Sequence, residues 1–184
     1  MARLAPSLAV LLLLLLLLLL LSGLVQAASL AGTHWERVAR SHGLDPRLLY
    51  AVALLESGRP AGAGVTPWPW VVHTPAGPRF FASEPEARTA LEALVAAHRP
   101  VELDVGLMQV NLGWHGTRVP SPAALLDPLT NLALAAEVLA QALRSAPGDP
   151  TLGVGRYHSW DAARARGYGE RVLALARALG ARGP

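Results

Sequence analysis

The amino-acid sequence predicts one mainly helical domain that carries a small β-hairpin insertion and follows a secretory signal segment. Three observations support this prediction. Apolar residues recur at helical spacing in several segments, and an N-cap signal precedes most of them. Extended apolar segments flank a turn rich in Pro and Gly at one place only. A long leucine run stands near the N-terminus.

The N-terminal segment has the three-part layout of a signal peptide. Arg3 precedes the apolar run Leu8–Leu21, which includes eleven consecutive leucines, and Val25–Ala27 supplies the small residue that a signal peptidase needs. A spanning helix needs about 20 apolar residues, and this run is shorter. We therefore expect a signal peptide over residues 1–27, one domain over residues 28–184, and no stable membrane span after cleavage. A retained anchor is the alternative.

The composition excludes several kinds of site. The chain has no cysteine, which excludes disulfides, thiol catalysis and a cysteine-linked lipid anchor. The formal net charge is +3, and the arginines are scattered without a run or a nucleic-acid motif. We expect no nucleic-acid partner, no cofactor and no metal site. Because they lack metal-ligand spacing, we interpret these histidines as surface or structural residues: His34, His42, His73, His98 and His115.

Capping signals place the helices along the chain. A Ser or Thr followed three residues later by Glu is a capping box, and Asp before Pro combines an N-cap with a first-turn proline. We expect helices to begin after Thr33, Asp45, Ser83, Ser121, Asp127 and Asp149, and a last amphipathic helix to begin at Gly169. The first should end at Gly43 and the second at about Ser57.

The extended segments lie between the second and third helices. Residues 70–73 and 79–81 are rich in Val and Phe and flank a Pro-Ala-Gly-Pro turn, which predicts a β-hairpin. Residues 59–69 are rich in Gly, Pro and Ala, and we expect them to form a loop.

Glu56 is the most distinctive acidic residue. Val52 and Leu49 precede it by four and seven residues, so Glu56 continues the apolar stripe of its helix. It also lies in the last helical turn, where the helix dipole disfavours a carboxylate. Both effects favour the protonated form, which a general acid requires near neutral pH. An ordinary polar residue at a helix end is the alternative interpretation.

Two further segments contain residues suited to binding. In Gly106–Asn111, the glycine permits close backbone approach, Met108 offers an adaptable apolar wall, and Gln109 brings both a donor and an acceptor. In Tyr157–Trp160, the phenol can bond to an acid or to a ligand hydroxyl. Taken singly, each segment is better explained as core or helix-end structure.

The order of these segments resembles the lytic transglycosylase family related to goose-type lysozyme. The matching segments are Glu56–Gly58, Gly106–Asn111, Asn131-Leu132 and Tyr157-His158, within a region from about Trp35 to the C-terminus. The segments Trp68–Trp70 and Arg156–Ser159 are most similar to the small transglycosylases of conjugation and type IV secretion systems. The resemblance implies a lysozyme-like α+β fold, export to the periplasm, and possible partners in a secretion or conjugation apparatus.

The resemblance also implies a reaction on peptidoglycan. Such enzymes protonate the glycosidic oxygen between N-acetylmuramic acid and N-acetylglucosamine. The muramyl 6-hydroxyl then attacks C1 to give a 1,6-anhydro product, without water or metal. Glu56 would be the catalytic acid and then base, and Tyr157 would hydrogen-bond to it or stabilise developing charge. The implied substrate-binding residues are Ser57, Gly106, Leu107, Met108, Gln109, Asn111 and His158.

Two alternative functions remain. A hydrolytic muramidase would use Asp104 to position water, although we expect Asp104 to bond to backbone amides in the turn before Gly106. A non-catalytic wall-binding component of a secretion or conjugation apparatus is disfavoured by the intact Glu56. Trp70 and Trp114 are candidates for stacking on sugar rings, while core packing is the default for tryptophan.

The exported form should begin at Ala28, because a signal-peptidase site precedes that residue. N-terminal sequencing of protein from the exported fraction checks this expectation. An intact terminus at Met1 or Ala2 would show instead that the leucine run is kept as an anchor.

Overall fold

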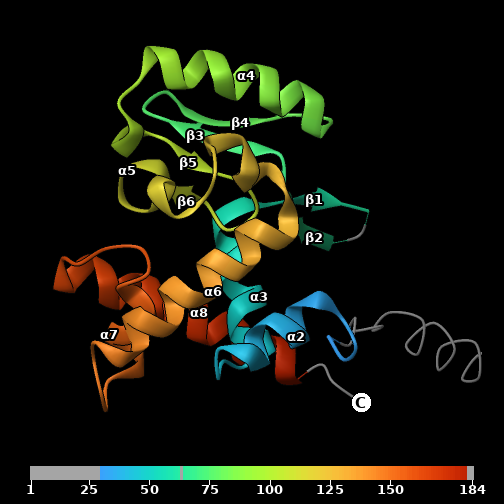
Figure 1. Ribbon diagram of the computed structural model, residues 1–184. Coiled ribbons are helices and arrows are strands. Elements are labelled where there is room, and N and C mark those ends of the chain that lie inside the picture. Colours follow the sequence, from blue (N-terminus) through green and yellow to red (C-terminus); the bar gives the residue numbers. More distant parts are fainter. Residues whose placement is uncertain (1–29, 63, 182–184) are drawn as a thin grey trace, which may run out of the picture.

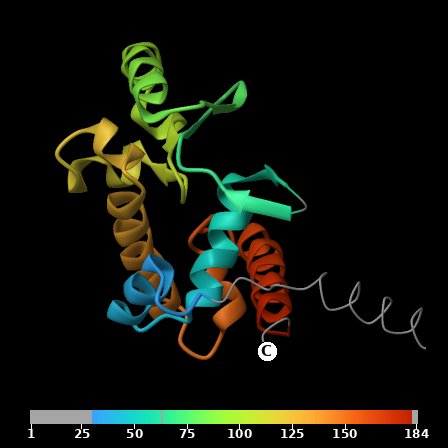
Figure 2. The ribbon, with the colours of Figure 1, turned by 90° about the vertical axis from the view of Figure 1, so that its right-hand side faces the viewer.

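The computed structural model describes residues 30–62 and 64–181, which form a mainly helical molecule with two small antiparallel sheets (Figures 1 and 2). The mainly helical character predicted from the sequence is confirmed, while the single β-hairpin that was expected is replaced by two small sheets. The expected signal peptide, residues 1–27, lies outside the described residues. Across the part that the structure describes, no helix combines the length and the apolar character needed to cross a bilayer.

One part of the molecule is a group of helices, seen in the lower half of Figure 1. Helices α3 and α8 lie side by side in both views, and α7 packs against α8. The long helix α6 runs from this group to the other part of the molecule. The bounds are α2 His34–Ser41, α3 Pro46–Ser57, α6 Pro128–Arg144, α7 Pro150–Gly155 and α8 Ala162–Ala181.

The other part is built on a four-stranded antiparallel sheet of order β4-β3-β5-β6, which α4 covers (Figure 1). The strands are β3 Val71–Thr74, β4 Gly77–Phe80, β5 Asp104–Val105 and β6 Val110–Asn111. The helices are α4 Glu84–Ala97 and α5 Leu112–His115, with 3₁₀ turns η1 Pro100–Glu102, η2 Gly116–Arg118 and η3 Pro122–Leu126. A separate hairpin, β1 Gly58–Ala61 with β2 Gly64–Pro67, continues directly from α3.

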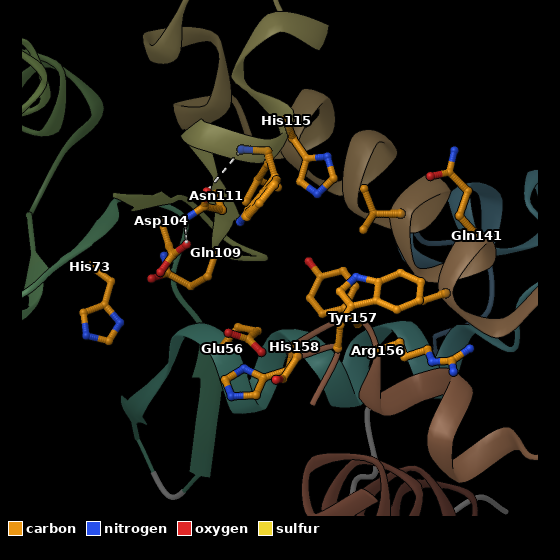
Figure 3. A pocket seen from close by; sticks show the side chains of 16 residues that line it. Glu56, His73, Asp104, Gln109, Asn111, His115, Gln141, Arg156, Tyr157 and His158 are labelled. Atoms are coloured by element: carbon orange, nitrogen blue, oxygen red, sulfur yellow. Dashed lines mark hydrogen bonds between the residues drawn. The ribbon is translucent and has the colours of Figure 1, made fainter. Parts of the chain in front are cut away.

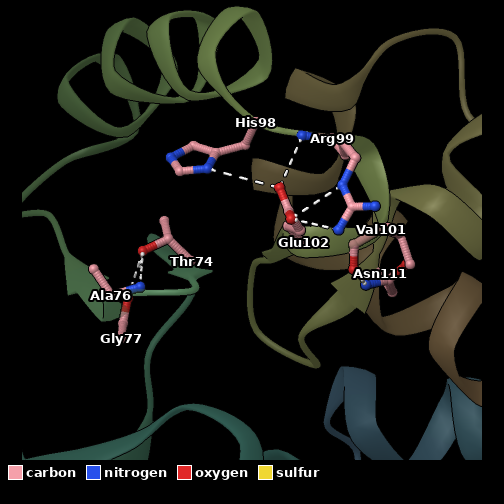
Figure 4. Close-up of polar contacts among 8 residues, drawn as sticks. All are labelled: Thr74, Ala76, Gly77, His98, Arg99, Val101, Glu102 and Asn111. Atoms are coloured by element: carbon pink, nitrogen blue, oxygen red, sulfur yellow. Dashed lines mark hydrogen bonds and ion pairs between the residues drawn. The ribbon is translucent and has the colours of Figure 1, made fainter.

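Local side-chain bonds close the turns of the sheet part (Figure 4). Thr74 Oγ1 donates to the Gly77 carbonyl at 3.1 Å and accepts from the Ala76 N–H at 3.2 Å, which fixes the β3–β4 turn. Glu102 accepts from the backbone N–H of Arg99 at 3.1 Å and from its guanidinium at 2.7 Å. These bonds fix the segment that leads from α4 into β5.

The capping signals are confirmed at five of the predicted helix starts, whereas Ser121 makes no capping bond and is followed only by the 3₁₀ turn η3. At these five starts, the side chain of the N-cap residue accepts a hydrogen bond from a backbone N–H in the first turn: Thr33, Asp45, Ser83, Asp127 and Asp149. Such a bond satisfies one of the four N–H groups that a helix start leaves without an intrahelical partner. Gly43, in the left-handed conformation, follows the end of α2 as expected.

The loop expected over residues 59–69 is wrong, because that segment forms the β1–β2 hairpin. The predicted β3–β4 hairpin is confirmed, but β5 and β6 extend it into a larger sheet. Each of these two added strands has only two residues, which is too short for an alternating pattern. Their pairing therefore depends on tertiary contact with β3.

Helix α8 begins at Ala162, seven residues before the predicted start. Gly167 and Gly169 lower the helix propensity of this segment, so the sequence pattern did not predict the first two turns. Gly169 and, in α7, Gly155 permit close packing between the two helices. A Cβ on Gly155 would lie 1.8 Å from the Ala165 carbonyl oxygen, and one on Gly169 would lie 2.0 Å from that of Thr151. Packing between α7 and α8 therefore overrides the weak helix propensity of the start of α8.

The side chain of Asn131, in the first turn of α6, ties the sheet part to the helical part. It is fully buried, and its Oδ1 accepts from the Met108 N–H at 2.8 Å. Its Nδ2 donates to the carbonyl of Val105 at 2.8 Å and to that of Leu125 at 2.9 Å. One amide therefore fixes β5, the turn between β5 and β6, and the end of η3.

Gly106→Ala should destabilise the fold more than Gly148→Ala does. Both glycines have φ +82, so each alanine adopts an unfavourable left-handed conformation, at a cost of about 1–2 kcal/mol. At Gly106 the new Cβ would also lie 2.4 Å from Asn131 Nδ2 and from the Leu125 carbonyl oxygen, whereas nothing lies within 4 Å at Gly148. Overpacking adds about 1–3 kcal/mol. Urea unfolding of both variants measures the difference, and equal losses would contradict the account of Asn131.

Candidate active site

A cleft of about 800 Å³ opens where the helical part meets the sheet part, and Figure 3 shows the side chains that line it. Its walls come from the end of α3, from strands β3, β5 and β6, from α5 and α6, and from the segment between α7 and α8. The lining residues are Glu56, His73, Asp104, Gln109, Val110, Asn111, Trp114, His115, Val138, Gln141, Ala142, Arg156, Tyr157, His158, Ser159 and Trp160.

Glu56 lies in the middle of this cleft, at the end of α3 (Figure 3). Leu49 and Val52 on the same helix are fully buried, as the apolar stripe predicted. The Tyr168 hydroxyl donates to Glu56 Oε1 at 2.5 Å. Burial raises the pKa of Glu56 to about 7, the Tyr168 hydrogen bond opposes that rise, and the neighbouring Asp104 carboxyl adds to it. The carboxyl is therefore protonated in much of the population near neutral pH.

Asp104 is the second acidic group of the cleft. Its Oδ1 accepts from Asn111 Nδ2 at 2.8 Å, so its partner is a side chain across the β5–β6 pair. The expected bonds to backbone amides of the turn are not among the contacts of the described residues. Burial raises the pKa of Asp104, while the Asn111 bond and the charges of His73 and His158 lower it. The Asp104 carboxylate thus lines the cleft with Oδ1 bonded to Asn111.

The hydroxyl that binds the acid belongs to Tyr168, and the expected bond from Tyr157 to Glu56 is wrong. Tyr157 lines the cleft but donates to the Met108 carbonyl at 2.7 Å. Tyr168 lies in the first part of α8, just before Gly169, where the sequence predicted this helix to begin. Its spacing of four and seven residues from Val172 and Leu175 is the signal that could have revealed it.

His158 lines the cleft, as predicted, and stacks on the Tyr168 ring with 4.7 Å between centroids and 4° between planes. Burial lowers the pKa of His158, and the nearby Arg171 guanidinium lowers it further. Arg171 also lies 5.8 Å from the Tyr168 ring centre. His158, Tyr168 and Glu56 therefore form a contiguous polar group at the floor of the cleft.

Four predicted binding residues do not face the cleft. Ser57 is buried, and its hydroxyl donates to the Leu107 carbonyl at 2.6 Å while accepting from the Trp68 N–H. Gly106, Leu107 and Met108 are buried as well, and the last two belong to the core. These residues hold the turn behind the cleft. Ser57 bonds to the backbone of the turn, and the side chains of Leu107 and Met108 pack into the core.

Gln109 and Asn111 do line the cleft, as predicted. Gln109 has a positive φ of 50, and its Nε2 donates to the Gly106 carbonyl at 2.8 Å. The amide group of Asn111 is fully engaged. Its Nδ2 reaches Asp104 and the Val101 carbonyl, and its Oδ1 caps the start of α5. Gln109 Nε2 also donates to the Val71 carbonyl at 3.4 Å, so the Gln109 side chain offers a ligand its Oε1 as an acceptor.

Aromatic residues at the rim only partly follow the predictions. Trp114 lines the cleft and is 74% exposed, as stacking on a ligand requires. Trp70 instead packs edge-on against Trp68 at 5.5 Å, away from the cleft. Trp160, the last residue of the Tyr157–Trp160 segment, was not among the two candidates for stacking, although it lines the cleft and is 71% exposed. His73 and His115 were interpreted as surface or structural residues, but both line the cleft, brought there by β3 and α5.

Within residues 30–62 and 64–181, no group of three or more His, Asp or Glu side chains is arranged to hold a metal ion. No family model, curated protein or solved structure matches this chain.

Glu56→Gln should stabilise the fold at alkaline pH relative to wild type. Unfolded Glu56 titrates near 4.5 and folded Glu56 near about 7, so the folded state binds the extra proton between those values. Wild-type stability therefore falls as pH rises through this interval, while the glutamine does not titrate. The difference should grow to about 1–3 kcal/mol in favour of the variant by pH 8. Denaturant unfolding at pH 4.5 and pH 8 measures it.

Tyr168→Phe and Tyr157→Phe provide the matched comparison. The Tyr168 bond lowers the pKa of Glu56, so removing it should extend the loss of stability to higher pH. Tyr157 donates to a backbone carbonyl, so its replacement should lower stability by an amount independent of pH. A pH-independent difference for Glu56→Gln would show that the carboxyl is solvated.

Proposed function

We propose that this chain is a peptidoglycan lytic transglycosylase, a lyase that cleaves the β-1,4 bond between N-acetylmuramic acid and N-acetylglucosamine. The observation that carries the proposal is Glu56, a carboxyl with a pKa of about 7 in the middle of an open cleft. A general acid needs a pKa near the operating pH, together with access to the substrate. The mainly helical fold and the order of the motifs agree with the resemblance to this lysozyme-like family.

In the proposed reaction, Glu56 first donates its proton to the glycosidic oxygen as the bond to C1 breaks. Oε1 accepts the Tyr168 hydroxyl, so the acidic proton sits on Oε2. The muramyl 6-hydroxyl then forms a bond to C1, and its proton returns to Glu56. The products are a 1,6-anhydromuramyl end and a free 4-hydroxyl, and no water is consumed. Attack from within the substrate has an effective molarity on the order of 10⁵ M or more when well oriented.

The two tyrosines take different roles in this proposal. Tyr168 stabilises the Glu56 carboxylate after proton transfer, because its hydroxyl already points at Oε1. Tyr157 has committed its only proton to Met108, so it presents oxygen lone pairs to the cleft. Those lone pairs suit the positive charge that develops at C1. Tyr157 therefore remains a proposed catalytic residue.

A hydrolytic muramidase is the second candidate, and the position of Asp104 favours it. Hydrolysis with a second carboxylate needs that group in the same cleft as the acid. Asp104 lines the cleft with Glu56, and the Asp104 charge adds to the rise in the pKa of Glu56 that burial causes. In the transglycosylase reaction Asp104 needs no role, since the substrate supplies the nucleophile.

We further propose an exported, periplasmic protein whose substrate is the glycan strand, with a secretion or conjugation apparatus as its setting. This part of the proposal rests on the N-terminal leucine run and on the Arg156–Ser159 segment. A non-catalytic wall-binding role is disfavoured because a desolvated Glu56 costs stability without serving binding.

Digestion of purified peptidoglycan should release 1,6-anhydromuramyl products, which mass spectrometry distinguishes from hydrolytic products by the missing water. Glu56→Gln should lower the rate by at least about 10²–10⁴-fold with the fold intact, because it removes the general acid. Asp104→Asn should keep most of the activity. Product analysis and thermal melting of both variants make the test.

Reducing-end muramic acid as the main product, together with an inactive but folded Asp104→Asn, would establish the hydrolase instead. Substantial turnover by a folded Glu56→Gln variant would rule out both assignments.

A further inference from the structure

Arg156 lines one end of the cleft. It lies with Gln141 on the side of Glu56 that is away from Asp104 and His73 (Figure 3). Several other arginines of the described chain form ion pairs with carboxylates, for example Arg88 with Glu84 and Arg99 with Glu102. Arg156 makes no such pair among the described residues, although it is only partly exposed.

Two contacts hold the Arg156 guanidinium in place. Nη1 donates to the Ser145 carbonyl at 2.5 Å and to its hydroxyl at 2.9 Å. The guanidinium carbon lies 5.0 Å from the ring centre of Trp160. Nε is buried and has no hydrogen-bond partner, and Nη2 makes no hydrogen bond within the described part of the chain. The fork is therefore fixed on one side and unsatisfied on the other.

Asp149, whose pKa the Arg156 charge lowers, does not pair with the Arg156 guanidinium. Its carboxylate already pairs with Arg166 at 2.8 Å and caps α7 through the Leu152 N–H. A partly buried arginine without a hydrogen-bonded anion is costly, and its planar fork matches a carboxylate. An anionic group on a ligand in the cleft would offset this cost.

We propose that Arg156, with Gln141 and Trp160, binds a carboxylate on the muramyl substituent of the glycan strand, so that the enzyme prefers strands that carry this acid. The inference rests on the proposed function for the substrate class. The sugar rings themselves are uncharged, so the carboxylate comes either from the peptide stem or, in strands without stems, from the free lactyl group. Gln141 lines the cleft beside the same position with its Nε2 also donating to Glu137 Oε1 at 3.2 Å, and Trp160 offers an exposed ring.

The test uses stem-bearing strands and strands stripped of stems by an amidase, each before and after amidation of the carboxylates. For wild type, amidation should lower kcat/KM by about tenfold, through KM, because a charge-assisted bond is lost. Arg156→Gln should cleave acidic and amidated strands equally. Arg144→Gln removes the same charge from an exposed position outside the cleft and should behave as wild type. The strand type on which amidation matters identifies the source of the carboxylate.

Arg156→Lys keeps the charge but loses the fork, and it should retain part of the acid preference even if the glutamine variant folds poorly. Sedimentation of a Glu56→Gln protein with the insoluble strands measures binding without cleavage and should show the same preference. Equal cleavage of acidic and amidated strands by wild type, or an equal loss on all strands in Arg156→Gln, would overturn the inference alone. Failure of wild type to cleave any strand would overturn the proposed function as well.

Discussion

The buried carboxamide of Asn131 is the interaction on which the cleft depends. It bonds to backbone groups of three segments that are distant in sequence, and each of these bonds is shielded from water. Removing the Asn131 carboxamide would leave these buried backbone groups without a hydrogen-bond partner, at a cost of about 1–3 kcal/mol each. Because the turn is held from behind by Asn131 and Ser57, the Met108 carbonyl is fixed for Tyr157, and Gln109 is turned toward the cleft.

The electrostatics of the cleft follow from partial burial combined with access. Two carboxyls, Glu56 and Asp104, lie in one partly desolvated space, and burial raises the pKa of both. Each has one hydrogen-bond donor that offsets part of this effect, Tyr168 for the glutamate and Asn111 for the aspartate. Arg171 adds a positive charge near Glu56. Together these effects place the pKa of Glu56 at about 7, so that near neutral pH the carboxyl can both donate and accept a proton.

The binding residues show how a motif can be right in position and wrong in role. The Gly106–Asn111 segment does lie at the cleft, yet only its polar end faces it, while Met108 is fully buried. The tyrosine that bonds to Glu56 also differs from the predicted one. Tyr157 stands at the predicted place, but its hydroxyl reaches a carbonyl, and the acid is reached by Tyr168 from a helix whose start was misplaced.

Local signals in the sequence determined the helix starts that carry a capping side chain, the β3–β4 hairpin and Glu56 at the end of an apolar stripe. Capping and periodicity act within one or two turns, so these features can be predicted from neighbouring residues. Only the tertiary structure decided which side chains meet. Contacts between distant segments pair β5 with β3 and bring α8 against α3. Such contacts also bury Arg156 Nε without a hydrogen-bond partner. Those contacts are set by packing of the whole core, and no local pattern encodes them.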